Sequence, residues 1–318
     1  MASILDAVVP LFAVIFAGYL AGRTHMLAED VVRALNRFVF SIAMPPMLFR
    51  LMATSDIASL GEGRFILGMF WAELMVFLLG AILGGLLLRQ RFADMVMQGF
   101  GSSFSNSMLL ALPLLIALHG EKGAVPALLL FTLDVLTFTI ITTMLETARA
   151  RDGQGSGSVL ASARTSLVAI VKNPIIMATL LGILWGLLGL PLPGLVSKTF
   201  GFLGQAAPPA ALFALGATLA FRKVRGSVGS ASVMVLIKLL VHPALAFVAL
   251  VYLFPVDPFW VHAGVVFAAC PVGANVYVFA AHYGIQVTAA SAAILVSTGL
   301  AMLTITALLV MYPPPLPA

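Results

Sequence analysis

Long apolar runs recur along this chain, and they restrict its fold more than any other feature. A hydrophobic stretch of about 20 residues lets an α-helix cross a bilayer, whereas the strands of a membrane barrel would be short and alternating. Ten runs of this length cover residues of about 3–22, 31–52, 64–88, 93–118, 123–146, 168–189, 196–221, 228–254, 259–283 and 287–311. The sequence therefore predicts an all-α integral membrane protein with ten transmembrane helices.

The charge content agrees with a chain surrounded by lipid. Only 9% of the 318 residues are charged and 61% are hydrophobic, with a mean hydropathy of +1.10. A soluble domain carries about 25% charged residues. The isoelectric point of about 9.7 could suggest nucleic acid as a partner. The basic residues, however, lie in short clusters between apolar runs, as the positive-inside rule produces, so we expect a lipid bilayer and no nucleic acid.

The distribution of basic residues predicts the orientation. Twelve Lys and Arg residues, from Arg23 to Arg225, lie in or beside loops that follow odd-numbered spans. Four follow even-numbered spans, namely Arg50, Arg64, Lys122 and Lys198. Because cytoplasmic loops are rich in Lys and Arg, both termini are expected on the periplasmic side of the inner membrane.

A Gly- and Ser-rich stretch at 147–167 divides the chain into two halves of five spans, 1–146 and 168–318. Such a composition is typical of a flexible linker, which here would be cytoplasmic. Pro45 and Pro208, Glu73 and Lys238, and the glycines that end "ALHG" and "AHYG" recur 163 to 165 residues apart. Five spans per half reverse the direction of the second half, so the pattern predicts two inverted repeats.

The fourth and ninth spans carry residues that interrupt transmembrane helices. The fourth contains "SNSMLLALPLL" (105–115), with Asn106 and Pro113, and the ninth contains "CPVGANVYVFAAHYG" (270–284), with Pro271, Gly273 and Asn275. Paired interruptions at corresponding positions are typical of transporter binding sites. The alternative is structural, since Pro and Gly are common in membrane helices and Asn can bond a neighbouring helix.

These two motifs resemble the crossover segments of the auxin efflux carrier family, which includes plant auxin exporters and bacterial malonate permease-like carriers. The opening "VVPLFAVIFAGYLAGR" and the segment "KNPIIMATLLGILWG" resemble the family as well. The resemblance implies the fold of bile-acid symporters and sodium/proton antiporters. Spans 1, 2, 6 and 7 would form a scaffold, and spans 3–5 and 8–10 a transport domain with broken crossover helices.

The resemblance also implies an organic anion as substrate and is compatible with a homodimer through the scaffold. The family's asparagine and proline in the first crossover fall on Asn106 and Pro113, and its second proline falls on Pro271. Asn275 matches bacterial members better than plant ones.

Several groups in the interrupted spans could hold a carboxylate in the membrane. Helix N-termini offer free N–H groups and partial positive charge. The amides of Asn106 and Asn275 and the hydroxyls of Ser103, Ser105 and Ser107 are further donors. We expect these groups, with the bends at Pro113, Pro271 and Gly273, to form the substrate site.

Three ionisable residues lie within predicted spans, namely Glu73, Asp134 and Lys238. Charged groups in lipid are costly and are functional candidates. Glu73 and Lys238 could pair across the repeat axis, in a coupling or a structural role, or extend toward an interface. Asp134 could hold H⁺ or Na⁺, or could be hydrogen-bonded structure.

The prediction that results is a secondary transporter of a small organic anion, such as malonate or an auxin-like acid, with no cofactor and no metal site. A cation/proton antiporter of the same fold is the alternative, although it would favour acidic residues where the crossovers have Asn. A membrane receptor is a third hypothesis. An intramembrane enzyme is disfavoured because the sequence has no hydrolase, zinc-protease or phosphate-loop motif.

Overall fold

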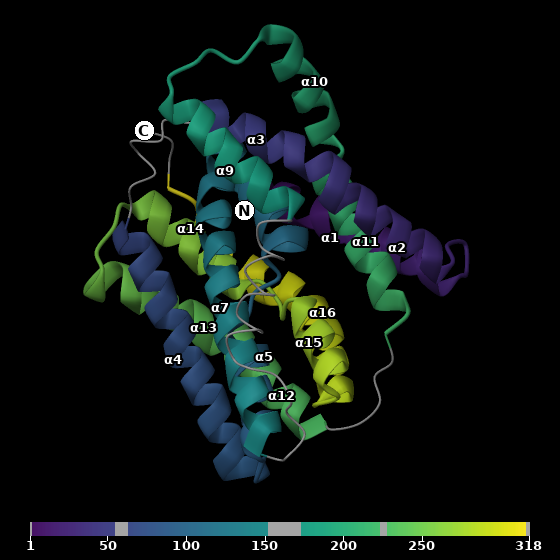
Figure 1. Cartoon of the computed structure of the whole chain (residues 1–318), viewed down its shortest axis with the longest axis vertical. Helices are drawn as coiled ribbons and strands as arrows, with labels where there is room; N and C mark the ends of the chain where they lie inside the picture. Colours follow the sequence, from purple (N-terminus) through teal and green to yellow (C-terminus); the bar gives the residue numbers. More distant parts are fainter. Residues whose placement is uncertain (1, 55–62, 152–172, 223–227, 316–318) are drawn as a thin grey trace.

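The computed structural model of the chain describes residues 2–54, 63–151, 173–222 and 228–315. Nearly all of them are helical, and within these ranges extended pairing is limited to one bridge between Ser105 and Val272. Most of the predicted linker at 147–167 and the start of the predicted span 168–189 lie outside the described residues. The described part is thus all-α, as the apolar runs predicted (Figure 1).

The first half begins with a single long helix and continues through interrupted ones. Its elements are α1 (Ala2–Arg23), α2 (Glu29–Phe38), the π-helical turn η1 (Val39–Ala43), α3 (Met44–Thr54), α4 (Gly63–Leu88), α5 (Phe92–Ser103), the π-helical turn η3 (Ser107–Ala111), α6 (Leu112–His119), the 3-10 turn η4 (Gly120–Gly123) and α7 (Ala124–Arg151). The predicted span 93–118 is therefore two helices, with a non-helical segment at 104–106.

The second half has a similar order of elements. They are α9 (Pro174–Leu187), α10 (Gly194–Gln205), α11 (Ala207–Ala220), α12 (Val228–Leu236), η5 (Ile237–Val241), α13 (His242–Val248), η6 (Ala249–Leu253), α14 (Pro258–Ala269), α15 (Asn275–Tyr283) and α16 (Val287–Met311). The predicted span 259–283 is likewise divided, at 270–274. Pro at the start of α9 and α14 fits a first helical turn, where its missing N–H is not needed.

Equivalent elements start at a nearly constant distance along the chain. The starts of α3 and α11, α4 and α12, α5 and α14, and α7 and α16 are separated by 163 to 166 residues. This agrees with the offsets between sequence motifs. The two breaks at 104–106 and 270–274 thus occupy corresponding places in the two halves.

Several helices are suited to a bilayer by length and composition. Five helical stretches among the described residues are long and apolar enough to cross a membrane, namely Gly63–Leu88, Ser107–Ala150, Gly194–Ala220, Val228–Leu253 and Val287–Met311. Shorter apolar helices are Val8–Arg23, Pro174–Leu187 and Pro258–Ala269. The five longer stretches have the length that a multi-pass membrane protein requires.

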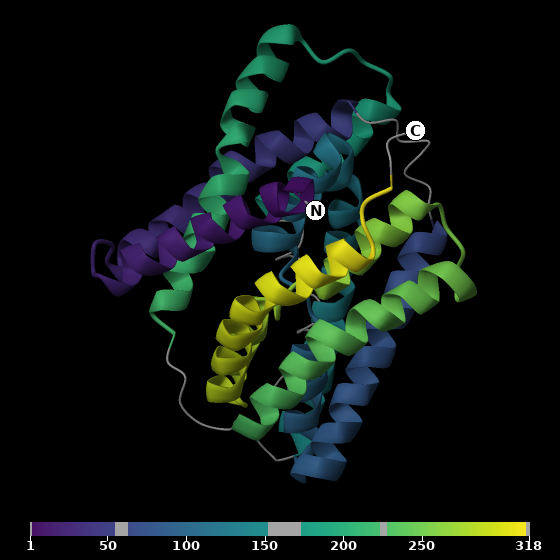
Figure 2. The same ribbon diagram turned by 180° about the vertical axis from the view of Figure 1, so that it is seen from behind.

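The helices gather into two groups (Figures 1 and 2). In both views α1, α3, α10 and α11 lie above, and α4, α12 and α16 lie below. In the upper group α1 packs on α11, and α3 packs on α9 and α10. A Cβ added to Gly18 of α1 would collide with the backbone of Phe213, and one added to Gly216 of α11 would collide with that of Ile15. Small residues therefore let these two backbones touch, as membrane helices often do.

Candidate functional site

Two interrupted helices meet at their breaks, where residues far apart in the sequence exchange backbone hydrogen bonds. The Asn106 N–H donates to the Pro271 carbonyl at 2.9 Å, and the Gly273 N–H donates to the Phe104 carbonyl at 3.0 Å. These two bonds form the Ser105–Val272 bridge. The breaks therefore satisfy part of each other's backbone, which lipid could not do.

Local sequence explains why the second chain segment can approach the first so closely. Pro271 has no N–H and cannot continue the hydrogen-bond pattern of α14. A Cβ on Gly273 would lie 2.5 Å from the Phe104 ring and 2.7 Å from the Ser105 carbonyl oxygen, so only glycine fits. Both residues are buried. Their role in the structure is to open the helix and to admit the opposite backbone.

Side chains from neighbouring helices bind the remaining backbone groups near the second break. The Ser105 hydroxyl donates to the Phe267 carbonyl at 3.0 Å. The Val272 N–H donates to the Ser297 hydroxyl oxygen at 3.1 Å. The Lys238 ammonium donates to the Ala268 carbonyl at the end of α14. Buried backbone groups of an opened helix need such partners, so the break is supported from three directions.

Asn106 is the polar residue at the centre of the first break. Its side chain is 4% exposed, and among the described residues its amide nitrogen has no hydrogen-bond partner. An unsatisfied buried donor costs about 1–3 kcal/mol. Asn106 also lines a cavity of about 490 Å³, which we call the central cavity. Asn106 therefore borders the cavity, and its buried amide nitrogen is an unsatisfied donor beside it.

The central cavity lies between the two helix groups. Residues of the two breaks line one side of it, namely Ser105, Asn106, Ser107, Gly273, Ala274 and Asn275. The other side includes Asn36 of α2, Ser41 of η1, Asn173 before α9, Thr218 of α11 and Arg222 after α11. Apolar walls come from residues such as Phe104, Phe138 and Leu215. A few polar groups on mostly apolar walls are typical of a small-molecule site.

The structure brings together four of the eight residues expected to bind substrate as side chains of this cavity, namely Ser105, Asn106, Ser107 and Asn275. Gly273 lines it through its backbone. Ser103 instead borders a small void behind the first break, together with Glu73 and Asp134. Pro271 contributes its carbonyl to the bridge, and Pro113 is buried in the first turn of α6. The lining of the central cavity thus includes five of the eight residues expected to bind substrate.

The ionisable residues of the lower group lie around the breaks. The Asp134 carboxylate accepts a hydrogen bond from the Ser107 hydroxyl at 2.8 Å, and the Glu73 carboxylate accepts one from Thr137 at 3.2 Å. Lys238 is fully buried and lies 3.1 Å from Nδ1 of His242. A direct ion pair between Glu73 and Lys238 was one of the alternatives, and the described ion pairs do not include it. Lys238 instead contacts the second break.

Sequence reasoning missed the upper wall of the cavity. Arg222, just after α11, served in the sequence only as a loop cation that indicates orientation. In the structure its guanidinium carbon lies 3.5 Å from the centroid of the Tyr277 ring. Asn36, on the strongly amphipathic helix α2, donates a hydrogen bond to the Thr218 hydroxyl oxygen at 3.2 Å. No local signal marks these residues, because the packing of α2 and α11 brings them to the cavity.

Comparison with known proteins identifies the family. The model of the membrane transport protein family matches residues 3–309. The chain is 33% identical over 310 residues to a protein of Rhizobium meliloti named "Putative malonate transporter", covering 97% of this chain and 96% of that protein. The chain belongs to this family of membrane transport proteins, which includes the auxin efflux carriers. It is thus a membrane transporter rather than an enzyme.

More distant members of the family span most of the chain as well. Auxin efflux carrier component 8 of Arabidopsis thaliana is 23% identical over 334 residues, which cover 89% of this chain and 90% of that protein. An uncharacterized transporter of Methanothermobacter thermautotrophicus is 27% identical over 247 residues, or 76% of each chain. The expected resemblance to auxin efflux carriers is confirmed.

A second cavity in this family member adjoins the central one. It has a volume of about 570 Å³, and its lining shares Asn36, Thr218 and Arg222 with the central cavity. Glu29 and Arg33 at the start of α2 also line it, and they form an exposed ion pair at 3.4 Å. Arg222 therefore stands where the two cavities meet.

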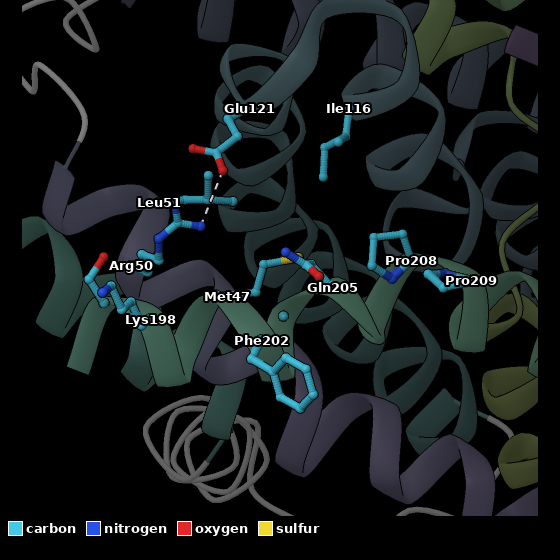
Figure 3. Close-up of a pocket in the computed structure, with 13 residues that line it drawn as sticks. Met47, Arg50, Leu51, Ile116, Glu121, Lys198, Phe202, Gln205, Pro208 and Pro209 are labelled. Carbon is cyan, nitrogen blue, oxygen red and sulfur yellow. Dashed lines mark hydrogen bonds and ion pairs between the residues drawn. The ribbon is translucent and has the colours of Figure 1, made fainter. Parts of the chain in front are cut away.

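A third cavity has a volume of about 680 Å³ (Figure 3). It lies toward the other end of α11 and of the stretch from α2 to α3, both of which also line the central cavity. It is lined by Met47, Arg50 and Leu51 of α3, Ile116 of α6, Glu121, and residues of α10 and α11 that include Pro208 and Pro209. Arg50 and Glu121 form an ion pair at 3.1 Å, which joins α3 to the turn after α6.

Proposed function

We propose that the chain is a secondary transporter of a small organic anion, a carboxylate such as malonate or an auxin-like acid, across the inner membrane. Ten spans would form two inverted five-helix repeats with broken crossover helices. Spans 1, 2, 6 and 7 would be the scaffold, and spans 3–5 and 8–10 the transport domain. The recurrence of element starts and the two groups of helices support this arrangement.

One observation carries the proposal: Asn106 lines the central cavity, and its buried amide nitrogen lacks a partner among the described residues. Beside it, Ser105 and Ser107 and the helix start at Asn275 line the same cavity. An anion would accept hydrogen bonds from the amides of Asn106 and Asn275, because the hydroxyls of Ser105 and Ser107 already donate to Phe267 and Asp134. Neutral donors would also let the anion leave. The name of the Rhizobium relative is consistent with a carboxylate substrate.

The arrangement of cavities supports alternating access. The central and third cavities are lined by the same three parts of the chain, namely α2 to α3, η3 to α6, and α11. Between the two linings lie apolar residues that are essentially unexposed, such as Leu48, Leu112 and Leu212. In this conformation the substrate site would be closed toward the third cavity by packed side chains and by the Arg50–Glu121 pair. An elevator-like or rocking displacement of the transport domain would reverse this closure.

Asp134, Glu73 and Lys238 are proposed as coupling or conformational residues. The Asp134 carboxylate accepts a hydrogen bond from Ser107, the residue after Asn106. Binding of H⁺ or Na⁺ to this carboxylate would therefore alter a hydrogen bond next to the first break. The same buried carboxylates favour the alternative function, a cation/proton antiporter of this fold. In that alternative the carboxylates would carry the transported ion, whereas here they would couple it to the anion.

Flux in proteoliposomes tests the function and separates the two candidates. We expect uptake of at least one member of a panel of mono- and dicarboxylates, sensitive to a Na⁺ or pH gradient and lost in Asn106→Ala. Cation or proton flux without any carboxylate flux would contradict the anion transporter and favour the antiporter.

The orientation is tested separately by reporter fusions. A periplasmic reporter after Ala318 should be active, and one inserted at Gly155 should be inactive, because the basic loops are expected in the cytoplasm. The opposite pattern would contradict an external position for both termini.

A further inference from the structure

The third cavity has more positive than negative charge on its walls. Arg50 of α3 and Lys198 of α10 line it, together with Glu121 of the turn η4 (Figure 3). In the described part of the chain Lys198 is in none of the ion pairs. A hollow lined mainly by one sign of charge raises the local concentration of ions of the opposite sign. The cavity is therefore suited to attract anions.

The guanidinium of Arg50 is held at the wall of this cavity by a single carboxylate. Its Nη1 donates to Oε1 of Glu121 at 3.1 Å, and the group has no other hydrogen bond to the described residues. A Cβ added to Gly201 of α10 would lie 3.5 Å from Nη1, so the guanidinium lies between α3, α10 and η4. The planar donors of Arg fit a carboxylate with two parallel hydrogen bonds. Arg50 is thus placed to bind a carboxylate, whether from Glu121 or from solution.

The ion pair of Arg50 and Glu121 is exposed enough to exchange partners. The Glu121 side chain is 63% exposed, and that of Arg50 is 29% exposed. Ion pairs in contact with water contribute only about 0.2–1 kcal/mol to stability. Glu121 also belongs to a turn of four residues rather than to a long helix. A dissolved carboxylate can therefore take the place of Glu121 at a small cost in free energy.

We propose that the third cavity is a second anion site, in which a carboxylate from solution displaces Glu121 from the guanidinium of Arg50 while Lys198 supplies a further positive charge. This inference rests on the proposed anion-transport function and adds a site outside the central cavity. Glu121 would be an internal competitor, which occupies the guanidinium when no anion is present. The volume of about 680 Å³ is in the range of small-molecule sites.

The exchange would also act on the closure of the central cavity. The pair joins α3 of the upper group to the turn after α6, and it is one of the contacts proposed to close the substrate site toward the third cavity. A ligand shifts a conformational equilibrium toward the state that it binds better. An anion that replaces Glu121 would remove this contact and favour opening toward the third cavity.

Two variants distinguish this site from an ion pair that is only structural. A structural pair is lost equally in Arg50→Gln and in Glu121→Gln, so the two variants would change anion binding in the same direction. An anion site predicts opposite directions, because Arg50→Gln removes the binding group whereas Glu121→Gln removes its competitor.

A cysteine in the cavity wall can report binding at this place. Ser197 of α10 lines the third cavity and is partly exposed, and the single native cysteine, Cys270, is buried. The probe is the rate at which a maleimide labels Ser197→Cys in nanodiscs, measured with acetate, malonate or succinate and with malonamide as the uncharged control. At least one carboxylate should slow labelling in a saturable way, and malonamide should not.

The concentration that gives half of this protection should shift differently in each variant. Arg50→Gln should raise it by about tenfold to hundredfold, because hydrogen bonds to a charged group are lost. Glu121→Gln should lower it by about twofold to fivefold, which corresponds to an exposed ion pair. Lys122→Gln is the matched control: Lys122 is an exposed cation of the same turn that is absent from the described lining, and its loss should change nothing. If Arg50→Gln fails to insert, Arg50→Lys decides, with an expected rise of about threefold to tenfold.

The inference is overturned if Arg50→Gln and Glu121→Gln shift protection in the same direction or leave it unchanged. It is also overturned if none of the three carboxylates protects Ser197→Cys although proteoliposomes transport one of them. Both outcomes leave organic-anion transport through the central cavity intact. The absence of flux for every carboxylate would instead contradict the proposed function, whatever the labelling shows.

Discussion

The two breaks are equivalent in their place along the chain but differ in how their asparagines are exposed. Asn106 is buried, and its amide nitrogen has no partner among the described residues. Asn275 is exposed at the start of α15. A buried donor has no water to replace a lost ligand, whereas an exposed one does. We therefore expect the first break to supply the specific polar anchor for a substrate, and the second to supply the backbone and space around it.

Among the variants of the two breaks, replacement of Asn106 should weaken substrate binding the most. Asn106→Ala should weaken substrate binding by about tenfold to hundredfold, because one donor to an anion contributes about 1.5–3 kcal/mol. Asn106→Asp should be worse, since a carboxylate would repel the anion. Calorimetric titration with the transported anion measures both, and size-exclusion chromatography checks folding. Unchanged affinity in folded Asn106→Ala would show that the first break is only structural.

Gly273→Ala tests whether the second break acts through its backbone. The new Cβ would overlap Phe104 and the Ser105 carbonyl, so the contact between the breaks would have to open. We expect a loss of about 1–3 kcal/mol in the free energy of unfolding, together with weaker binding. Gly299→Ala is the matched control, because a Cβ there meets open space. Equal thermal stability of the two variants would contradict a close approach at Gly273.

Lys238 and Glu73 should act on different breaks. Lys238→Met leaves the Ala268 carbonyl at the second break without its donor and should destabilise the protein by about 1–3 kcal/mol. Glu73→Gln changes a side chain bound to Thr137, beside Asp134 and the first break. Since the two residues do not form a direct ion pair, a double-mutant cycle in thermal stability should give a coupling below about 1 kcal/mol. A coupling of several kcal/mol would show that Glu73 and Lys238 do form a direct ion pair.

Asn275→Ala should have the smallest effect, below about threefold in affinity, because water replaces the exposed amide. From the sequence alone, the amides of Asn106 and Asn275 had the same role as donors, and the difference in burial is what separates them. The same titration measures this variant. A loss as large as that of Asn106→Ala would show that Asn275 becomes buried when the substrate binds.

Most of the fold could be predicted from the sequence. Apolar length located several of the long helices, with boundaries such as 64–88 and 287–311 close to those of α4 and α16. Pro271 and Gly273 indicated the second interruption, because both act on their own backbone. The motif around Asn106 indicated the first. These are properties of short segments, so they can be deduced without knowledge of distant contacts.

The tertiary structure decided which polar groups share the site. Asn106 and Pro271 are separated by 165 positions, and their hydrogen bond depends on the packing of two helix pairs. Arg222 reaches the central cavity only because α11 packs beside the breaks, and Lys238 contacts Ala268 rather than Glu73. Burial, and with it the energetic importance of each donor, is set by neighbours from other parts of the chain. A span pattern carries no information about those neighbours.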